Sequence, residues 1–466
     1  MHGESCAVWA RDKKEKYRKR RFRLRTALAV LACRGSSVLL RKLGRGGSSL
    51  PGLLALALDR EILGKLAQGV EVTAVTGTNG KTTTCGMISQ MFQKAKIRHL
   101  SNASGANLIQ GIVTAFARNS SLSGGCRYSR AVIECDEGTL RKVAGALKIR
   151  CLVVTNLFRD QEDRFGDPAD TAGLLREGIR QIPGALLCLN ADCPLTSSLA
   201  EGLPNPVVWF GVEDQGPGEP VQDQPEELCC SYCGSRYEYS RKTYGCLGDF
   251  YCPECGHSRM EPETAVTRVL DTGRDASEFL LRIEKKEWRA QVNLPGYENL
   301  YNAAAAAAAA GTAGISPENR IQALAEYSCC FGRGEEAEIV WSRVRMFLTK
   351  NPVGFNLAIR WILREKQECN LVFLLNDRPA DGKDISWIRK TDLEALAREQ
   401  QRFPRLLVSG LRRKEMAERL REAGFEQEKV EEIQDLRVLL EAVGAQGTPA
   451  VLLANYTALQ ELRRRL

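Results

Sequence analysis

The 466-residue sequence is poor in histidine and contains no long apolar run. Its three histidines are His2, His99 and His257, and none stands in a setting that suggests the Cys–His pair by which a thiol nucleophile is usually activated. No apolar run approaches the ~20 residues that a membrane span needs, and the brief apolar stretch at 26–32 is too short and poorly flanked for a signal peptide. We therefore expect a cytoplasmic protein that does not use a Cys–His nucleophile.

Cysteine, by contrast, is abundant. Seventeen Cys, an odd number spread through a long chain, favour reduced thiols and a metal site over a disulfide framework. With 44% apolar and 26% charged residues, the chain has the composition of a globular protein with two or three domains.

The net charge of +9 is concentrated near the N-terminus. Between Arg11 and Arg25, ten Lys or Arg accompany two acidic residues, Asp12 and Glu15. Such a basic arm could bind anionic lipid or nucleic acid by charge neutralisation, or it could be a solvated helix. A lipid-linked substrate would favour contact with the inner face of a membrane.

The central motif is VTAVTGTNGKTTTC at 72–85, where a β-branched run meets a Gly-rich turn and then a pattern of helical period. This order predicts a strand, a phosphate-binding loop and a helix, in which Lys81 reaches the β- and γ-phosphates of a bound triphosphate and Thr82 holds Mg²⁺. The alternative is a glycine-rich turn that binds no nucleotide. The predicted nucleotide-binding residues are Thr76, Gly77, Thr78, Asn79, Gly80, Lys81, Thr82 and Thr83.

From residue 71 onward, β-branched runs alternate with amphipathic stretches, which predicts a mostly parallel, doubly wound α/β sheet. Glu134 follows the run AVI at 131–133, so it is expected at the carboxyl end of a strand, where it could hold Mg²⁺ opposite Thr82. An acidic loop without metal is the alternative. Asn299 and Asn302 begin a long alanine run that predicts a helix. Their spacing resembles the NxxNAxAA feature of Mur ligases, and this resemblance implies that they close the nucleotide site; capping of the helix is the alternative.

The segment at about 226–260 contains two CxxC pairs, each followed by Gly, and an aromatic hairpin pattern lies between the pairs. Four thiolates at this spacing suit tetrahedral Zn²⁺ in a closed structural site, which has no open position for water. The predicted zinc ligands are Cys230, Cys233, Cys252 and Cys255.

The loop TGTNGKTTT, the stretch SGAN at 104–107, the Cys₄ ribbon and the motifs KNPVGFN at 350–356 and LNDRPADGKDISW at 375–387 together resemble the MurT family. These proteins are the Mur-ligase-like subunits of lipid II isoglutaminyl synthase. The resemblance implies a Mur ligase-type P-loop central domain with a Cys₄ zinc-ribbon insertion, plus a C-terminal Rossmann-like α/β domain. We expect a basic helical lead-in at 1–70, the central ATP-binding domain at 71–330 and the C-terminal domain at 331–466.

The resemblance also implies an activity. It is the ATP-dependent amidation of the D-glutamate α-carboxylate of lipid II to D-isoglutamine through an acyl phosphate. The ammonia would come from a separate GatD-like class I glutaminase in a heterodimer, which agrees with the scarcity of histidine. In this family the Asp of the DGxDxSW motif is thought to orient the partner's catalytic His, and that residue is Asp384 here. A turn-capping role for Asp384 is the alternative.

The sequence departs from the family after SWI, where Arg389 and Lys390 replace the usual aromatic and acidic residues. Two other functions stay open. One is an amino-acid ligase of the folylpolyglutamate synthase type, against which the ribbon and ADGKDISW argue. The other is a zinc-ribbon ATPase that binds nucleic acid through the basic arm, in which TGTNGKTTT and SGAN would have no part. We expect no nucleic-acid partner.

Overall fold

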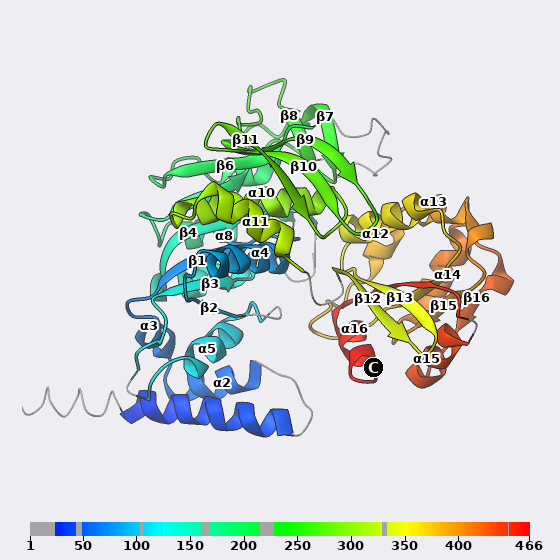
Figure 1. Cartoon of the computed structure of the whole chain (residues 1–466), viewed down its shortest axis with the longest axis horizontal. Coiled ribbons are helices and arrows are strands. Elements are labelled where there is room, and N and C mark those ends of the chain that lie inside the picture. The colour runs from blue at the N-terminus through cyan, green and yellow to red at the C-terminus, as the bar shows by residue number, and fades with distance from the viewer. Residues whose placement is uncertain are drawn as a thin grey trace, which may run out of the picture.

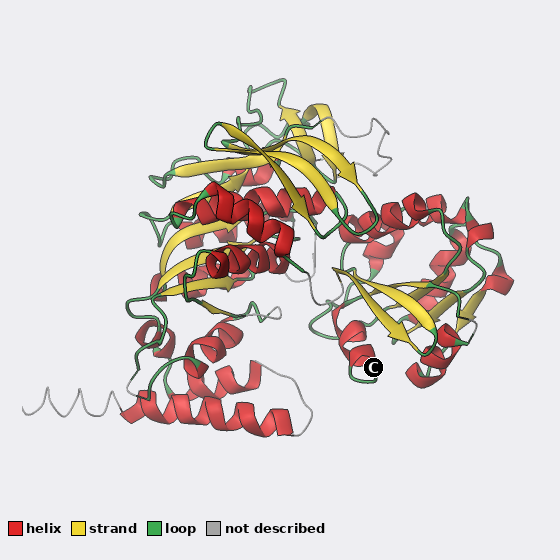
Figure 2. Ribbon diagram, in the orientation of Figure 1, coloured by secondary structure: helices red, strands yellow, loops and turns green. Residues whose placement is uncertain are grey.

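The computed structural model describes residues 24–42, 49–102, 106–122, 124–159, 167–214, 228–328, 333–445 and 447–466. These residues form two α/β bodies that lie beside each other, and a group of N-terminal helices extends from the first body (Figure 1). Helices pack around the strands in both bodies (Figure 2). The last helix of the first body ends at Glu326, and the first strand of the second body begins at Arg333.

The first body is built on a nine-stranded sheet of order β11-β10-β9-β6-β5-β4-β1-β3-β2. All the strands from β2 to β9 in this order pair in parallel, and β10 and β11 continue the sheet as an antiparallel meander. A mostly parallel α/β sheet, as predicted, is thus confirmed. The strands are β1 (Glu71–Thr76), β2 (Leu100–Ser101), β3 (Arg130–Glu134), β4 (Lys148–Val154), β5 (Leu186–Asn190), β6 (Val207–Val212), β9 (Thr264–Thr272), β10 (Ser277–Ile283) and β11 (Lys286–Val292).

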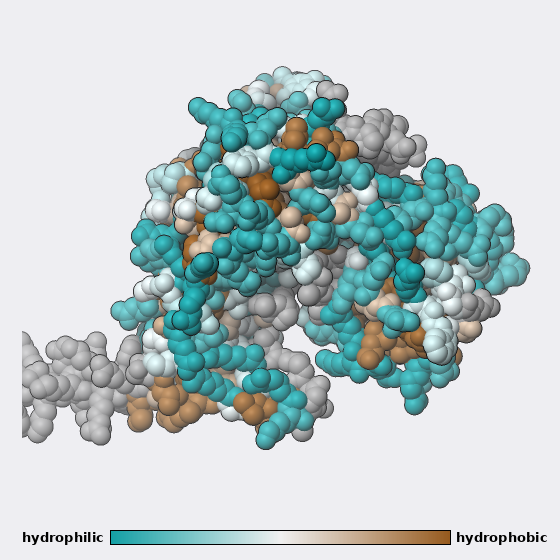
Figure 3. Space-filling model, in the orientation of Figure 1, coloured by the Kyte–Doolittle hydropathy of each residue, from teal (hydrophilic) through white to brown (hydrophobic). Residues whose placement is uncertain are grey.

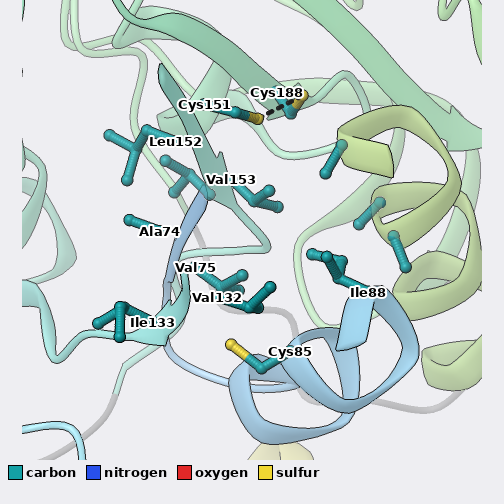
Figure 4. Packing of buried hydrophobic residues seen from close by; sticks show 14 of the residues in the cluster. Ala74, Val75, Cys85, Ile88, Val132, Ile133, Cys151, Leu152, Val153 and Cys188 are labelled. Atoms are coloured by element: carbon teal, nitrogen blue, oxygen red, sulfur yellow. Dashed lines mark hydrogen bonds between the residues drawn. The ribbon is translucent and has the colours of Figure 1, made fainter. Parts of the chain in front are cut away.

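The central strands are buried on both faces because helices cover them, as expected for parallel strands. These helices are α4 (Lys81–Lys94), α5 (Ile109–Arg118), α6 (Glu137–Val143), η1 (Ala144–Ala146), α8 (Pro168–Ile179), α9 (Pro194–Ser198), α10 (Tyr297–Thr312) and α11 (Pro317–Glu326). Figure 4 shows the core beside β1, with the labelled side chains Ala74, Val75, Cys85, Ile88, Val132, Ile133, Leu152 and Val153.

The alanine run forms the predicted helix, α10. Each alanine from 303 to 310 is buried, so the run is the inner part of the helix and not a solvent face. Small side chains let α10 lie close to α4 and to the strands β5 and β6. This packing brings the first turn of α10 to the start of α4.

A two-stranded hairpin, β7 (Glu238–Tyr244) and β8 (Leu247–Tyr251), interrupts the chain between β6 and β9. Because β6 and β9 are neighbours in the sheet, the hairpin is an insertion between two paired strands. Its turn packs on the main core through Tyr244, Cys246 and Leu247.

The second body has a six-stranded sheet of order β12-β13-β17-β14-β15-β16, in which β12 alone is antiparallel to its neighbour. Its strands are β12 (Arg333–Ile339), β13 (Ser342–Leu348), β14 (Asn370–Leu374), β15 (Leu406–Ser409), β16 (Val430–Glu432) and β17 (Ala450–Ala454). Its helices are α12 (Pro352–Glu365), η2 (Ser386–Lys390), α13 (Leu393–Ala397), η3 (Gln400–Arg402), α14 (Arg413–Glu422), η4 (Gln427–Lys429), α15 (Leu436–Gly444) and α16 (Tyr456–Arg463). The alternation of strand and helix agrees with the predicted Rossmann-like body.

The lead-in before β1 is helical over residues 24–42, α2 (Ser49–Leu58) and α3 (Ile62–Leu66). Most of the basic arm, up to residue 23, lies outside the described residues. Among the described helices, none combines the length and apolarity needed to cross a membrane.

Candidate active site

The loop between β1 and α4 requires glycine at two positions. Gly77 and Gly80 have φ values of +119° and +84°. A Cβ atom on Gly77 would lie 2.3 Å from Thr155 Oγ1, and one on Gly80 would lie 2.1 Å from Asn302 Oδ1. Backbone conformation and space therefore both exclude larger residues at these positions.

The end of β4 holds this loop in place. Asn156 accepts a hydrogen bond from Thr78 N–H at its carbonyl oxygen and one from Asn79 N–H at Oδ1, each at 2.9 Å. Thr155 Oγ1 donates to the Asn79 carbonyl at 2.7 Å, and Phe158 N–H donates to Thr78 Oγ1 at 3.0 Å. The loop is thus fixed by backbone and side-chain groups at the carboxyl end of a neighbouring strand.

Lys81 is the first residue of α4, and its buried ammonium lies over the loop. It donates to the carbonyls of Gly77 and Thr78 and lies 3.3 Å from Glu137 Oε1. Burial raises the pKa of the Glu137 carboxyl, and the nearby Lys81 ammonium opposes that rise. No side chain caps α4 at Gly80, and the first N–H groups of a helix have no acceptor within it. These features fit the binding of a phosphate group.

Thr82 and Glu134 lie side by side at this loop. Thr82 Oγ1 donates to Glu134 Oε2 at 2.8 Å, and Asn107 Nδ2 lies 3.3 Å from Glu134 Oε1. Asn102 fixes the backbone of Glu134 with two hydrogen bonds of 2.8 Å, one to its carbonyl and one from its N–H. A carboxylate beside a hydroxyl is a donor set that Mg²⁺ accepts. Asn107 comes from the SGAN stretch, whose first two residues lie outside the described residues.

Of the two asparagines of α10, Asn302 lies against the loop at Gly80, and Asn299 contacts Asn302. Asn302 Oδ1 accepts from Thr84 Oγ1 at 3.2 Å, and its amide Nδ2 donates to Asn299 Oδ1 at 3.1 Å. Asn299 Nδ2 donates to the Pro295 carbonyl at 2.7 Å, so Asn299 also fixes the start of its own helix. Asn302 therefore lies against the loop, whereas Asn299 acts through Asn302. The remaining predicted residues, Thr76 and Thr83, are buried at the end of β1 and in the first turn of α4.

The second body closes on this loop from the other side. Asn351, the N-cap residue of α12, donates from Nδ2 to Asn79 Oδ1 at 3.1 Å and accepts from Gly354 N–H at 2.8 Å. Lys350 lies near enough to Glu137 to oppose the rise of its carboxyl pKa. Residues that follow β13 of the second sheet thus lie beside the loop that follows β1 of the first, and the carboxyl ends of parallel strands are where α/β sheets bind ligands.

The four predicted zinc ligands form a cluster separate from this loop. Among the described residues, Cys230, Cys233, Cys252 and Cys255 are the group whose sulfur atoms all lie within 4.8 Å of one another. Two of the sulfur–sulfur distances are 3.5 and 3.4 Å, close to the roughly 3.8 Å edge of a tetrahedron with Zn–S bonds of about 2.3 Å. The residues therefore fit Zn²⁺ with tetrahedral coordination.

The two CxxC turns share one geometry. Gly234 and Gly256 have φ values of +78° and +76°, and their N–H groups donate to the carbonyls of Cys230 and Cys252 at 2.9 and 3.0 Å. His257 does not join the sulfur cluster: its ring contacts Tyr237 Oη at 2.7 Å. The glycine after each pair is thus explained by the turn that the pair makes.

Asp384 lies on an exposed turn before η2. Its carboxylate accepts from Ser386 N–H at 2.8 Å and from Ser386 Oγ at 3.0 Å. The turn-capping contact is therefore present, and the carboxylate is also open to a partner. The neighbouring Arg389 forms an ion pair with Glu422 at 2.9 Å.

Sequence reasoning did not place Asn156, Glu137, Asn107 or Asn351 among the site residues. Asn156 and Asn351 follow β4 and β13, and Glu137 lies three residues after β3. All three are polar residues that follow the end of a strand, where the sequence pattern and the rule for parallel sheets lead us to expect ligands, but neither indicates a specific role for them.

Comparison with known protein families gives two matches. Residues 75–229 match the Mur ligase middle domain and residues 348–459 match the MurT ligase C-terminal domain. The chain is 36% identical over 445 residues to the MurT subunit of lipid II isoglutaminyl synthase (glutamine-hydrolyzing) of Streptococcus pneumoniae, covering 95% of this chain and 97% of that protein. The chain belongs to the MurT family. The MurT subunit of Staphylococcus aureus is 31% identical over 441 residues, covering 94% of this chain and 96% of that protein.

Solved structures share the fold of this MurT-family chain at low sequence identity. A pseudomurein peptide ligase type C from Methanothermus fervidus superimposes with a TM-score of 0.63 at 20% identity, covering 85% of this chain and 78% of that chain. A folylpolyglutamate synthase from Mycobacterium tuberculosis, complexed with ADP and AMPPCP, gives 0.63 at 15% identity, covering 94% and 98%. The chain is therefore an ATP-dependent ligase with the Mur ligase fold.

Proposed function

We propose that this chain is the synthetase subunit that amidates the α-carboxylate of D-glutamate in lipid II, forming D-isoglutamine. The MurT subunits that it resembles over nearly their whole length are named for lipid II isoglutaminyl synthase. The observation that carries the proposal is the grouping of Lys81, Thr82 and Glu134 at a glycine loop against which the second body closes.

The chemistry has two steps. The substrate carboxylate attacks the γ-phosphorus of ATP, so that a C–O–P bond forms, the bond to the β-phosphate oxygen breaks and ADP leaves. Ammonia then attacks the acyl carbon, inorganic phosphate leaves and the nitrogen loses a proton. Positioning and electrostatic stabilisation carry most of the catalysis in phosphoryl transfer.

The residues at the loop suit that first step. The N–H groups at the start of α4 and the Lys81 ammonium would hold the phosphates, and Thr82 with Glu134 would hold Mg²⁺. When bound, Mg²⁺ neutralises charge on the phosphate oxygens. Glu137 holds Lys81 beside the loop, and Asn302 supports the loop at Gly80.

The ammonia source is proposed to be a separate glutaminase subunit. In the described part of the chain, the rings of His99 and His257 hydrogen-bond to the Ile97 carbonyl and to Tyr237 and Ser197, and not to a thiol. This supports a synthetase that receives ammonia from a GatD-like partner. We place Asp384 in that partner's site, where it would orient the catalytic His.

A single experiment with two nitrogen sources tests both parts. The purified complex of this chain with a candidate glutaminase is supplied with lipid II, ATP and either labelled ammonium or glutamine, and the product is analysed by mass spectrometry. We expect labelled D-isoglutamine from ammonium. Addition of a whole glutamate residue would instead favour the folylpolyglutamate type of ligase.

The Asp384→Asn variant tests the partner contact in the same assay. It should lower glutamine-driven amidation by about a hundredfold, because an amide in place of the carboxylate no longer orients the His in the right tautomer. Amidation with ammonium should stay unchanged, so the ammonium assay of the same variant is the control. Unchanged glutamine-driven activity would contradict the role of Asp384.

A further inference from the structure

The N-terminal helices expose an unusual amount of apolar surface. Nine of the nineteen exposed large apolar side chains in the described residues lie between 24 and 58, each 41–62% exposed. Figure 3 shows this apolar surface in brown along the lower edge of the molecule, over the helix of residues 24–42 and α2. We call it the leucine face; its members are Leu24, Leu28, Leu31, Val38, Leu39, Leu50, Leu53, Leu54 and Leu58.

The opposite side of these helices is packed on the protein, so the leucine face has a fixed orientation. On the helix of residues 24–42, the buried side chains include Ala29, Val30 and Cys33. Arg34 Nε donates to the Ala117 carbonyl of α5 at 3.0 Å. On α2, Gly52 packs so closely on α5 that a Cβ atom would lie 1.8 Å from a backbone oxygen. A surface helix normally has a polar outer side, whereas these two helices are apolar on both sides.

The charged residues within the segment that forms the leucine face have one sign. Between Leu24 and Leu58 the sequence contains five Lys or Arg and no Asp or Glu. Arg25, Arg41 and Lys42 are exposed at the two ends of the first helix. Leucine flanked by basic residues is the composition of helices that lie in the interface of an anionic bilayer, where Lys and Arg contact the headgroups.

We propose that the leucine face docks the protein on the surface of an anionic phospholipid bilayer. The inference deepens the proposed function, on which it rests for a lipid-linked acceptor. A lipid bilayer is the partner that fits this surface, because the exposed side chains are apolar and the charged residues of the segment are basic. The basic arm up to residue 23 is no part of the proposed surface.

The test is binding of the full chain to vesicles that contain no acceptor and no nucleotide, so its result is independent of amidation. Vesicles of phosphatidylglycerol and phosphatidylcholine are compared with vesicles of phosphatidylcholine alone. The variant Leu31→Ser with Leu53→Ser keeps every charge and the whole basic arm. The matched control is Leu270→Ser with Leu411→Ser, at exposed leucines outside the leucine face.

We expect the wild type and the control to bind the anionic vesicles and the Leu31/Leu53 variant to bind at least about tenfold more weakly, because two leucines no longer leave water on docking. Equal binding by the two variants, or no binding by the wild type, would overturn the proposal. A change in oligomeric state by light scattering, with vesicle binding unchanged, would assign the leucine face to a second copy of the chain and also overturn it.

A second measurement covers the case in which the serine variant fails to fold. Leu31→Trp and Leu411→Trp are each mixed with anionic vesicles that carry brominated lipid. Extra quenching in the Leu31→Trp protein alone would place that side chain in the bilayer interface. Equal quenching in both proteins would contradict the proposal.

Discussion

The Cys₄ hairpin and the loop after β1 use polar side chains in opposite ways. The four thiols come from two like turns within residues 230–255 and face one another in a closed group. The loop site draws its side chains from β1, β3, β4, α4, α10 and the second body, and its Lys81 and Glu137 are buried. A closed thiolate site has no position left for a substrate, whereas the loop offers helix N–H groups, a cation and a carboxylate to one. We therefore propose different functions for the two sites, a structural one for the hairpin and a catalytic one for the loop.

The two sites are nevertheless joined by a short chain of contacts. The Tyr244 ring, at the turn of the ribbon hairpin, lies 5.9 Å from the Phe158 ring. Phe158 in turn donates its N–H to Thr78 in the loop at 3.0 Å. Substitutions that separate stability from turnover can show how far this contact couples the two sites.

The largest expected effect is at the loop. Lys81→Ala should lower ADP release by about a thousandfold or more, because the cation that stabilises the transferred phosphoryl group is lost. The fold should persist, since Glu137, whose pKa burial already raises, can take up a proton when its partner is gone. Steady-state ADP release and thermal unfolding measure the two effects. The control is Lys142→Ala, at an exposed lysine of α6; comparable loss in both variants would contradict the assignment.

At the hairpin we expect a loss of stability with little loss of turnover. Cys230→Ser with Cys252→Ser should remove the bound zinc and lower the unfolding midpoint by at least about 5 °C, since metal binding adds to folding free energy. At low temperature, ADP release per folded molecule should stay within about threefold of the wild type. Metal analysis, calorimetry and the ADP assay give the three readouts. Cys229→Ser is a matched control, because Cys229 is exposed and lies outside the sulfur cluster among the described residues.

Two outcomes would contradict a purely structural role for the hairpin. A purified protein that is free of metal and equally stable would exclude a structural zinc. If the variant lost more free energy of ATP binding than free energy of unfolding, the hairpin would instead position the loop through Tyr244 and Phe158.

A smaller effect is expected where the second body meets the loop. Asn351→Asp keeps the acceptor for Gly354 N–H but removes the amide donor to Asn79 Oδ1. We expect kcat/KM for ATP to fall about tenfold, because the loop is positioned less well when Asn351 no longer donates to Asn79. The unfolding midpoint should change little. Asn351→Ala should lose the helix cap as well, about 1 kcal/mol of stability. Full activity in the Asp variant would show that this contact does not serve the site.

The smallest effect concerns Glu298, in the first turn of α10. Burial raises its pKa to about 7 from an ordinary value of 4.5, with Arg360 and Arg364 opposing the shift. The folded state then holds the proton more tightly than the unfolded state, so stability should fall as the pH rises from about 4.5 to about 7 and level off above that. Glu298→Gln should remove about 3 kcal/mol of this dependence, measured by urea unfolding across that range. An unaltered pH profile would contradict the raised pKa.

What sequence reasoning could reach depends on how far apart the contacting residues lie in the chain. The strand, glycine loop and helix at 71–94 and the two CxxC turns follow from local spacing, and the structure confirms these elements. The predicted proximity of Thr82 and Glu134 is also found, because neighbouring parallel strands end at one edge.

Contacts across the fold could not be predicted in this way. That Gly80 must accommodate Asn302, and that Asn351 reaches Asn79, depends on how α10 and the second body pack against the loop. The leucine face was likewise missed: the spacing of leucines does not say which side of a helix is covered. Hydrophobic residues on both sides of 24–42, with no acidic residue among them, were the available signal.

The central claim is that this chain itself activates the carboxylate and uses ammonia. The most direct test is ADP release by the purified full chain with lipid II, supplied with ammonium in the absence of any glutaminase. We predict lipid II-dependent turnover with ammonium and none with glutamine alone, which is restored when the glutaminase is added. No turnover with ammonium, even in the assembled complex, or turnover that requires glutamate as the added amine, would contradict the claim.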